Sequence, residues 1–257
     1  MRTSYSPLLH VACDEWDMNE FCMQTHHTYP IANNQLTQHS ARKVYYFCYG
    51  SNMNGQRMND RGINYHTRAI GYLHNYILLF NKSPTNIPQH EFVSGVTGGF
   101  ATIKHIDHES KSCSSAAGIL GIVYEVCEND LNKLDVYEGV AQNHYYRHKV
   151  NVHTINGECV SATTYIACDS SCSDIGLIPP SEYLQHLLCG HDLLPASYID
   201  KLRALPTTNQ PLPAYLKQGN SAIQSSTDTN INTSATTAHA NDYAEQIMRA
   251  QQQINNV

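Results

Sequence analysis

The chain has 257 residues, of which 41% are hydrophobic and 15% charged, and its formal net charge is −6. This length is sufficient for one large domain or two small ones with a buried core. The acidic balance, with no basic run to neutralise a phosphate backbone, argues against a nucleic-acid partner. No apolar stretch reaches the length that crosses a bilayer, so we expect no membrane partner either.

Composition divides the chain into three parts. Residues 1–41 are polar and irregular, and we expect an irregular N-terminal extension. Residues 42–206 are dense in regular apolar patterns and are predicted to form one globular domain. Residues 207–257 are rich in Thr, Asn, Ser, Gln and Ala, and such a segment buries too little apolar surface to offset its ordering entropy. We therefore predict a disordered C-terminal tail, with a weak helix near residues 243–252.

The predicted elements of the central domain are mostly strands. Strand patterns cover residues 43–49, 72–80, 100–106, 117–126, 145–152 and 159–167, with an Asn156-Gly157 turn before the last. Helical patterns cover residues 54–61 and 131–138, the latter capped by Asn129 or Asp130, and two more helices begin at Ser181 and near Pro195. Many strands and few helices, without strict alternation, indicate an α+β fold with a closed or strongly curved mixed sheet.

The cysteines and histidines do not form a metal site in the sequence pattern. The nine cysteines are scattered, and Cys168 and Cys172 have no second pair to complete a zinc site. The fifteen histidines are also spread along the chain. Free thiols of this kind are typical of a reducing compartment, so we predict a cytoplasmic protein without a metal. The oligomeric state is left open, and a homodimer is compatible with the sequence.

The apolar run at residues 45–49 breaks on Gly50-Ser51-Asn52 before a helical stretch. The backbone amides of such a turn can hold an anion, although an ordinary turn has the same pattern. The turn lacks the following Gly-Lys-Ser/Thr of a nucleotide-binding loop and the second glycine of a nucleophile elbow. Cys48 lies inside the strand, where a thiol is usually inert. The pattern thus favours a small anion over a nucleotide or a covalent intermediate.

Glu138 is the candidate acid–base residue. It follows Leu131 and Leu134 at the i, i+3 and i+7 spacing that places three side chains on one helix face. Because the leucines are expected to point inward, the carboxylate does too, and burial raises the pKa of a carboxyl. Such a group can both accept and donate a proton. The alternative is a glutamate that reaches solvent or pairs with Arg147 or Lys149.

These segments resemble the γ-glutamylcyclotransferase family. The resemblance rests on three motifs: Tyr49-Gly50-Ser51-Asn52, Gly98-Gly99-Phe100-Ala101-Thr102-Ile103 and Leu134-Asp135-Val136-Tyr137-Glu138-Gly139-Val140. It continues in the same order through Tyr145, Thr164-Tyr165, Pro180-Ser181-Glu182-Tyr183, Cys189-Gly190 and Leu194-Pro195-Ala196-Ser197-Tyr198, so it covers about residues 42–206. The family commonly has alanine at the position of Cys48, a small change that should preserve the site.

The resemblance implies a small mixed β-barrel with flanking short helices. It also implies that a γ-glutamyl amino acid, a small-molecule substrate, is cyclised to 5-oxoproline with release of the amino acid and without a cofactor. Glu138 is then the general acid–base, and the amides of the turn hold the α-carboxylate of the substrate. The residues implied for substrate binding are Tyr46, Phe47, Cys48, Tyr49, Gly50, Ser51, Asn52, Tyr145 and Tyr183.

Three alternatives stay open at this point. The chain could act on γ-glutamyl amines or on glutathione, with the same fold. It could be a catalytically silent module that holds a small anion in the turn, although the presence of Glu138 argues against this. It could also be a thiol enzyme that uses Cys48, in which case alkylation at that residue would inactivate it.

Overall fold

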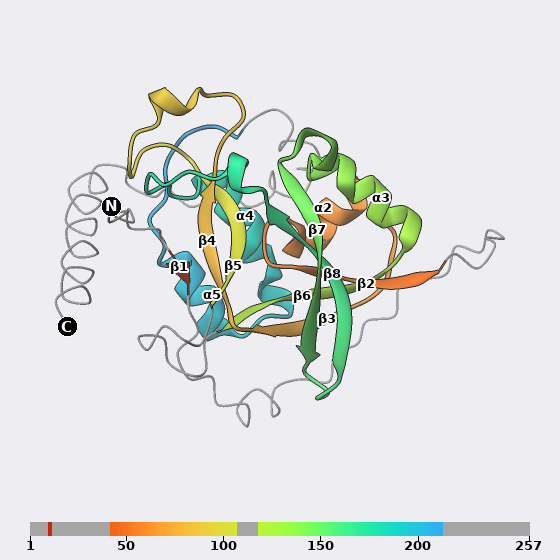
Figure 1. The fold of residues 1–257 in the computed structure, drawn as a ribbon. Helices are drawn as coiled ribbons and strands as arrows, with labels where there is room; N and C mark the ends of the chain where they lie inside the picture. The colour runs from red at the N-terminus through yellow and green to blue at the C-terminus, as the bar shows by residue number, and fades with distance from the viewer. Residues whose placement is uncertain (1–9, 12–41, 107–117, 213–257) are drawn as a thin grey trace.

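The structure is a computed structural model that describes residues 10–11, 42–106 and 118–212 (Figure 1). The predicted N-terminal extension lies almost entirely outside the described residues, as do most of the predicted tail and its weak helix. The described chain runs past the predicted domain end at residue 206. Thr208 forms a β-bridge with Pro180, and Leu212 is buried, so the segment up to residue 212 packs on the domain.

A closed barrel of five strands is the centre of the fold, with strand order β2-β6-β3-β7-β8 (Figure 1). Its strands are β2 (Lys43–Cys48), β3 (Tyr65–His74), β6 (Gly118–Cys127), β7 (Tyr145–Thr154) and β8 (Cys159–Ala167). Strands β2 and β8 are parallel, and the other neighbours are antiparallel. The predicted α+β fold with a small mixed barrel is therefore confirmed.

A smaller antiparallel sheet lies beside the barrel, with strand order β1-β4-β5. Its strands are β1 (His10–Val11), β4 (Tyr76–Lys82) and β5 (Phe100–His105). The α-helices are α2 (Gly55–Asp60), α3 (Glu128–Tyr137), α4 (Ser181–Leu188) and α5 (Ala196–Arg203). The 3-10 turns are η1 (Ser51–Met53), η2 (Gln89–Glu91), η3 (Val140–Gln142), η4 (Asp169–Ser171) and η5 (Cys189–Asp192). None of the helices in the described part of the chain is long and apolar enough to span a membrane.

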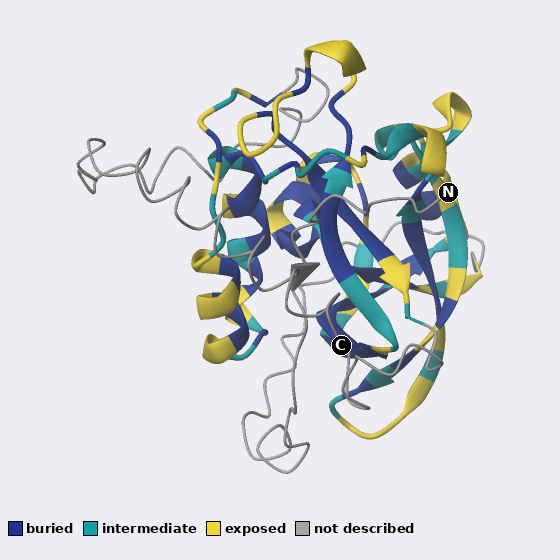
Figure 2. Ribbon diagram, turned by 60° about the vertical axis from the view of Figure 1, so that its left-hand side comes forward, coloured by how far each residue is buried: buried dark blue, intermediate teal, exposed yellow. Residues whose placement is uncertain are grey.

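The barrel interior is tightly packed, and Figure 2 shows buried residues along most of its strands. Phe47 is fully buried and its ring lies against Gly71 and Gly121. A Cβ atom at Gly121 would lie 2.7 Å from this ring and 2.3 Å from the Cys48 carbonyl oxygen. Only glycine therefore permits β6 to approach β2 this closely, which fixes the end of β2 where the chain turns toward η1.

The structure corrects several predicted element boundaries. The run at residues 72–80 was expected to be one strand, but Asn75 adopts a left-handed conformation (φ 62°) and separates β3 from β4, which belong to different sheets. Asparagine tolerates this conformation better than most residues. The expected side-chain caps are also wrong: α3 begins at Glu128 with Cys127 as N-cap, and Ser181 follows the N-cap Pro180 of α4.

Candidate active site

The turn after β2 is fixed at both ends. Gly50 is the N-cap of η1, and its carbonyl accepts a hydrogen bond from the Met53 N–H at 3.0 Å. Asn54 then caps α2, because its Oδ1 accepts from the N–H groups of Gln56 and Arg57 at 3.0 and 3.2 Å. The amides of Ser51 and Asn52 precede the first hydrogen bond of η1, so they have no partner within it. The local sequence thus builds the predicted strand-to-helix turn.

Glu138 lies at the C-terminal end of α3, and Gly139 follows in a left-handed conformation (φ 63°). Leu131 and Leu134 are buried on the same face of the helix, and the Glu138 side chain is only 16% exposed. The helix therefore carries the carboxylate inward. The alternative pairings do not occur: Arg147 forms an ion pair with Asp135 at 2.6 Å, and Lys149 donates to Thr163 Oγ1 at 2.8 Å.

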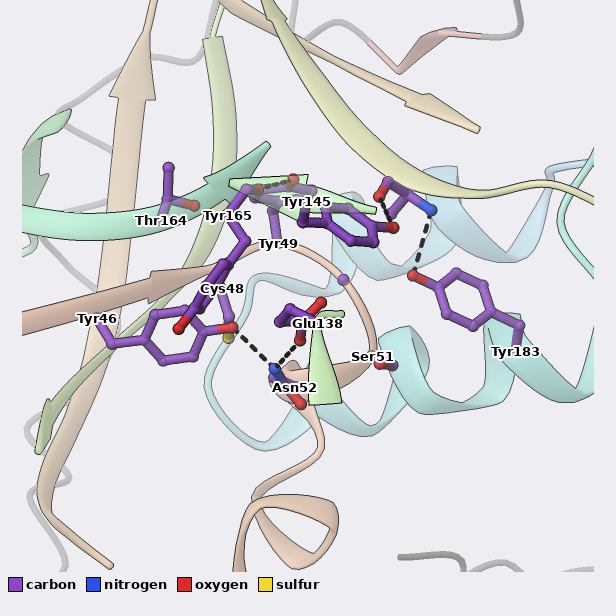
Figure 3. A pocket seen from close by; sticks show the side chains of 12 residues that line it. Tyr46, Cys48, Tyr49, Ser51, Asn52, Glu138, Tyr145, Thr164, Tyr165 and Tyr183 are labelled. Carbon is purple, nitrogen blue, oxygen red and sulfur yellow. Dashed lines mark hydrogen bonds between the residues drawn. The ribbon is translucent and has the colours of Figure 1, made fainter. Parts of the chain in front are cut away.

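Asn52 joins the turn to the carboxylate (Figure 3). Its Nδ2 donates to Glu138 Oε1 at 2.9 Å and to Tyr46 Oη at 2.8 Å. Its Oδ1 accepts from Arg61 Nη1 at 2.8 Å, and the same nitrogen lies 3.6 Å from Glu138 Oε1. The Asn52 carbonyl accepts from the Tyr124 hydroxyl at 2.9 Å. The side chain of Asn52 is thus held from several directions, and it holds the carboxylate in turn.

The environment of Glu138 favours its protonated form. Burial raises the pKa of this carboxyl above the ordinary glutamate value. The guanidinium of Arg61 and the hydrogen bond from Asn52 act in the opposite direction, but the net shift remains upward. A carboxyl that titrates closer to neutrality is suited to transfer a proton in both directions.

A hollow lies between the turn and Glu138, with about 310 Å³ of empty space that includes open solvent at its mouth. It is lined by Tyr46, Cys48, Tyr49, Gly50, Ser51, Asn52, Ala101, Glu138, Tyr145, Thr164, Tyr165 and Tyr183 (Figure 3). Two tyrosines are held by the backbone of Ala101. The Tyr145 hydroxyl donates to the Ala101 carbonyl at 2.9 Å, and the Ala101 N–H donates to Tyr183 Oη at 3.2 Å. The wall is therefore built from hydroxyl and amide groups in fixed positions.

The chain is similar to a known protein family and to named relatives. The family model described as the AIG2-like family matches residues 118–202. The human protein named γ-glutamylcyclotransferase is 27% identical over 163 residues, which are 62% of this chain and 77% of the human protein. The bovine protein of the same name is 25% identical over 173 residues, or 66% of this chain and 82% of the bovine protein. The chain is thus similar to the AIG2-like family and to proteins named γ-glutamylcyclotransferase.

Solved structures show the same fold. A structure titled γ-glutamyl cyclotransferase aligns with a TM-score of 0.50 at 21% identity, over 80% of this chain and 99% of the other. An ensemble-refined crystal structure of an uncharacterised human protein aligns with a TM-score of 0.52 at 24% identity, over 66% of this chain and 92% of the other. At these identities the likeness establishes the barrel architecture that positions the turn and α3.

The site brings together all the residues that the family resemblance implied except one. Phe47 does not line the hollow, because side chains alternate along a strand and its ring points into the barrel core. Thr164 and Tyr165 line the hollow but were not predicted to bind substrate. The motif Thr164-Tyr165 was visible in the sequence, yet its place beside the turn depends on the parallel pairing of β8 with β2.

Arg61 is a further site residue that the sequence did not indicate. It is buried at the end of α2, where its guanidinium contacts Asn52 and stacks over the Tyr137 ring at 4.6 Å from the centroid. The polar pattern of residues 54–61 gave no sign of this burial, because an arginine at the end of a short helix is usually solvated.

The thiol of Cys48 faces the hollow but is not set up as a nucleophile. It is 2% exposed, and burial raises its pKa well above that of an ordinary cysteine, so the thiol stays protonated. Within the described ranges, no three His, Cys, Asp or Glu side chains are grouped in a way that could hold a metal ion.

Proposed function

We propose that this chain cyclises γ-glutamyl amino acids to 5-oxoproline and releases the free amino acid. The observation that carries the proposal is the Glu138 carboxylate, 16% exposed at the wall of the hollow and hydrogen-bonded to Asn52 of the turn at 2.9 Å. The family relationship supports this reaction class, because the human and bovine relatives are named for it.

The reaction requires one proton shuttle and no protein nucleophile. The α-amine nitrogen of the substrate attacks its own γ-carbonyl carbon, and the new C–N bond closes the five-membered ring. The bond from the γ-carbonyl carbon to the leaving nitrogen then breaks. Glu138 as carboxylate accepts the proton that the α-amine loses, and as carboxylic acid it donates this proton to the leaving nitrogen. Bonds and protons therefore balance without a cofactor.

Two effects account for the rate in this proposal. Holding the amine beside the γ-carbonyl contributes as much as ~7–11 kcal/mol in favourable intramolecular cases. Proton transfer by a positioned carboxyl adds about 10²–10⁴-fold. In this assignment the amides of Ser51 and Asn52 hold the α-carboxylate of the substrate, and Tyr145 and Tyr183 form the wall against which the chain folds back.

The test is chromatographic detection of 5-oxoproline with a panel of substrates. The panel contains γ-glutamyl-alanine, other γ-glutamyl dipeptides, γ-glutamyl amines and glutathione. We expect turnover of the dipeptides. Release of 5-oxoproline only from an amine or only from glutathione would assign the chain to one of those alternatives. Absence of 5-oxoproline with every compound would overturn the proposal in favour of a silent anion-binding module.

A further inference from the structure

A second hollow lies next to the first, and the two meet at Glu138. It contains about 370 Å³ of empty space, which includes open solvent, and it shares Ser51, Glu138, Tyr145 and Tyr183 with the first hollow. Its remaining lining residues are Arg61, Lys82, Phe100, Tyr137 and His144. We call it the cationic chamber, because an arginine and a lysine line it together. Glu138 is the only carboxyl among its described lining residues.

Lys82 is placed in this chamber by an irregularity in the small sheet. Leu79 of β4 pairs with Thr102 of β5, but the next registered pair is Lys82 with Phe100, so β4 contains one extra residue. Such a bulge redirects side chains, often next to an active site. As a result Lys82 is 2% exposed although it is charged, and it lies beside Phe100, which lines the same chamber.

The ammonium of Lys82 has no carboxylate partner within ion-pair distance among the described residues. Its Nζ donates to the Ser83 carbonyl at 2.7 Å and lies 5.9 Å from the centre of the Tyr145 ring. An ammonium has three donors, so this carbonyl leaves capacity for a ligand. Burial lowers the pKa of Lys82 to about 8, as expected for a cation that has lost water without gaining a full counter-charge.

Arg61 adds a second positive charge to the chamber. Its Nη1 is used by Asn52, whereas its Nε has no hydrogen-bond partner among the described residues. A buried N–H group without an acceptor is costly, and an arriving anion removes part of that cost. The chamber is therefore complementary to a small anionic group located within a few bonds of the atom that Glu138 protonates.

The reaction geometry indicates which group this is. Glu138 protonates the leaving nitrogen, and in a γ-glutamyl α-amino acid the carboxylate carbon of the leaving unit is two bonds from that nitrogen. We propose that Lys82, assisted by Arg61, binds the α-carboxylate of the departing amino acid and thereby selects γ-glutamyl α-amino acids. Amines lack this carboxylate, and glutathione carries an amide in its place. This inference rests on the proposed function.

The decisive experiment uses two substrates that differ only in this group: γ-glutamyl-alanine and γ-glutamyl-alaninamide. Lys82→Met removes the charge and keeps most of the volume. We expect it to lower kcat/KM for γ-glutamyl-alanine by about 10- to 100-fold, the usual effect of losing a hydrogen bond to a charged group. Turnover of the alaninamide should stay within about threefold. Lys104→Met, at the exposed C-terminal end of β5, is the matched control and should change neither.

Equal losses on both substrates would overturn the inference, because Lys82 would then serve the glutamyl half or the fold. A wild-type protein that turns over both compounds equally well would overturn it without any variant. Lys82→Arg keeps the charge and should retain part of the preference for the carboxylate. This variant and the wild-type preference decide the question if Lys82→Met does not fold.

Binding separates this inference from the proposed reaction. Calorimetry with Glu138→Gln protein should show tighter binding of γ-glutamyl-alanine than of the alaninamide, and the difference should vanish in Glu138→Gln/Lys82→Met. If the wild type lacks turnover but shows this Lys82-dependent preference, only the reaction is wrong. If the wild type is active without any preference, only the role of Lys82 is wrong. Lack of both turnover and preference overturns both.

Discussion

The two hollows that meet at Glu138 differ in charge. The first is lined by tyrosine hydroxyls and turn amides, and none of its described lining residues is a lysine, arginine or histidine. The second, the cationic chamber, contains Lys82, Arg61 and His144. One carboxyl therefore borders two hollows of different charge, and each hollow can contact a different half of the substrate. In the proposed reaction, the first hollow binds the glutamyl half of the substrate, which forms the ring. The cationic chamber binds the amino acid that leaves and selects for its carboxylate.

Removing the carboxyl that both hollows share should slow the turnover of both substrates. We expect Glu138→Gln to lower kcat by about 10²–10⁴-fold for γ-glutamyl-alanine and its alaninamide alike, because both need the same proton transfer. Initial rates of 5-oxoproline release measure the effect, and thermal unfolding verifies that the fold is retained. An active Glu138→Gln protein would contradict the assignment of this residue.

Asn52→Ala should lower kcat less than Glu138→Gln does, because it changes the position of the carboxyl between the hollows without removing it. It removes the amide that positions Glu138 and leaves Arg61 and Tyr46 without their partner. We expect kcat to fall roughly tenfold or more, and stability to fall by about 1–3 kcal/mol, the usual cost of buried polar groups left unsatisfied. Gln56→Ala, which removes an exposed hydrogen bond to Asp60 on the adjacent helix, is the control for denaturant unfolding and rates. Equal behaviour of the two variants would refute the positioning role.

The preference for γ-glutamyl-alanine over the alaninamide should depend on pH, because Lys82 of the cationic chamber can lose its charge. The charged and titratable groups that act on Lys82 are Glu138 and Cys172, while Arg61 and His144 line the same chamber. Since Lys82 has a pKa of about 8, its ammonium is lost above that pH. The ratio of kcat/KM for γ-glutamyl-alanine to that for the alaninamide should therefore fall by up to about fivefold between pH 8 and 9. The ratio cancels the titration of the substrate amine, and a flat ratio would speak against Lys82.

Stability should also depend on pH through Glu138. Its pKa is raised in the folded state, so the folded protein binds more protons than the unfolded chain above the ordinary glutamate pKa. The contribution of Glu138 to stability therefore falls as pH rises from that value through the raised pKa, and is constant above it. Denaturant unfolding of the wild type and Glu138→Gln across pH 4 to 8 should show the variant gaining in relative stability with pH. A constant difference would mean that the pKa is not raised.

The smallest effect is expected for Cys48→Ala. The thiol is buried and protonated, so its removal should change kcat/KM by less than about threefold and cost about 1 kcal/mol of stability through a small cavity. Steady-state rates before and after treatment with an alkylating reagent provide the check. Loss of activity on alkylation of Cys48 would favour the thiol enzyme that the proposed mechanism excludes.

Local sequence patterns predict most of the fold and two parts of the site, the turn after the first strand and the inward carboxyl of Glu138. The strand at residues 43–49, its turn and the inward face of Leu131, Leu134 and Glu138 follow from neighbouring residues alone. The turn at Asn75 was missed because the polar pair His74-Asn75 is short and is flanked by apolar residues on both sides. Phe47 was misassigned because a contiguous motif was taken as one surface, although alternate residues of a strand face opposite sides.

The cationic chamber could not be predicted in the same way. Lysine and arginine are almost never fully buried unless they are paired, so the sequence gives no reason to place Lys82 and Arg61 inside the protein. Their burial results from a bulge in β4 and from the packing of α2 against α3 and the turn, which bring distant segments together. The position of Tyr165 beside the turn likewise depends on the parallel pairing of β8 with β2, which no local sequence pattern indicates.

The position of Glu138 at the C-cap of α3 has an electrostatic consequence. The aligned peptide dipoles of a helix leave a partial negative charge at its carboxyl end, where a carboxylate is disfavoured by about 0.3–1 kcal/mol. No basic residue in the last turn of α3 offsets this field. Gly139 stops the helix here, and a Cβ atom at that position would lie 2.4 Å from the His144 ring. The length of one helix thereby helps to keep the proton on the enzyme until the leaving nitrogen takes it.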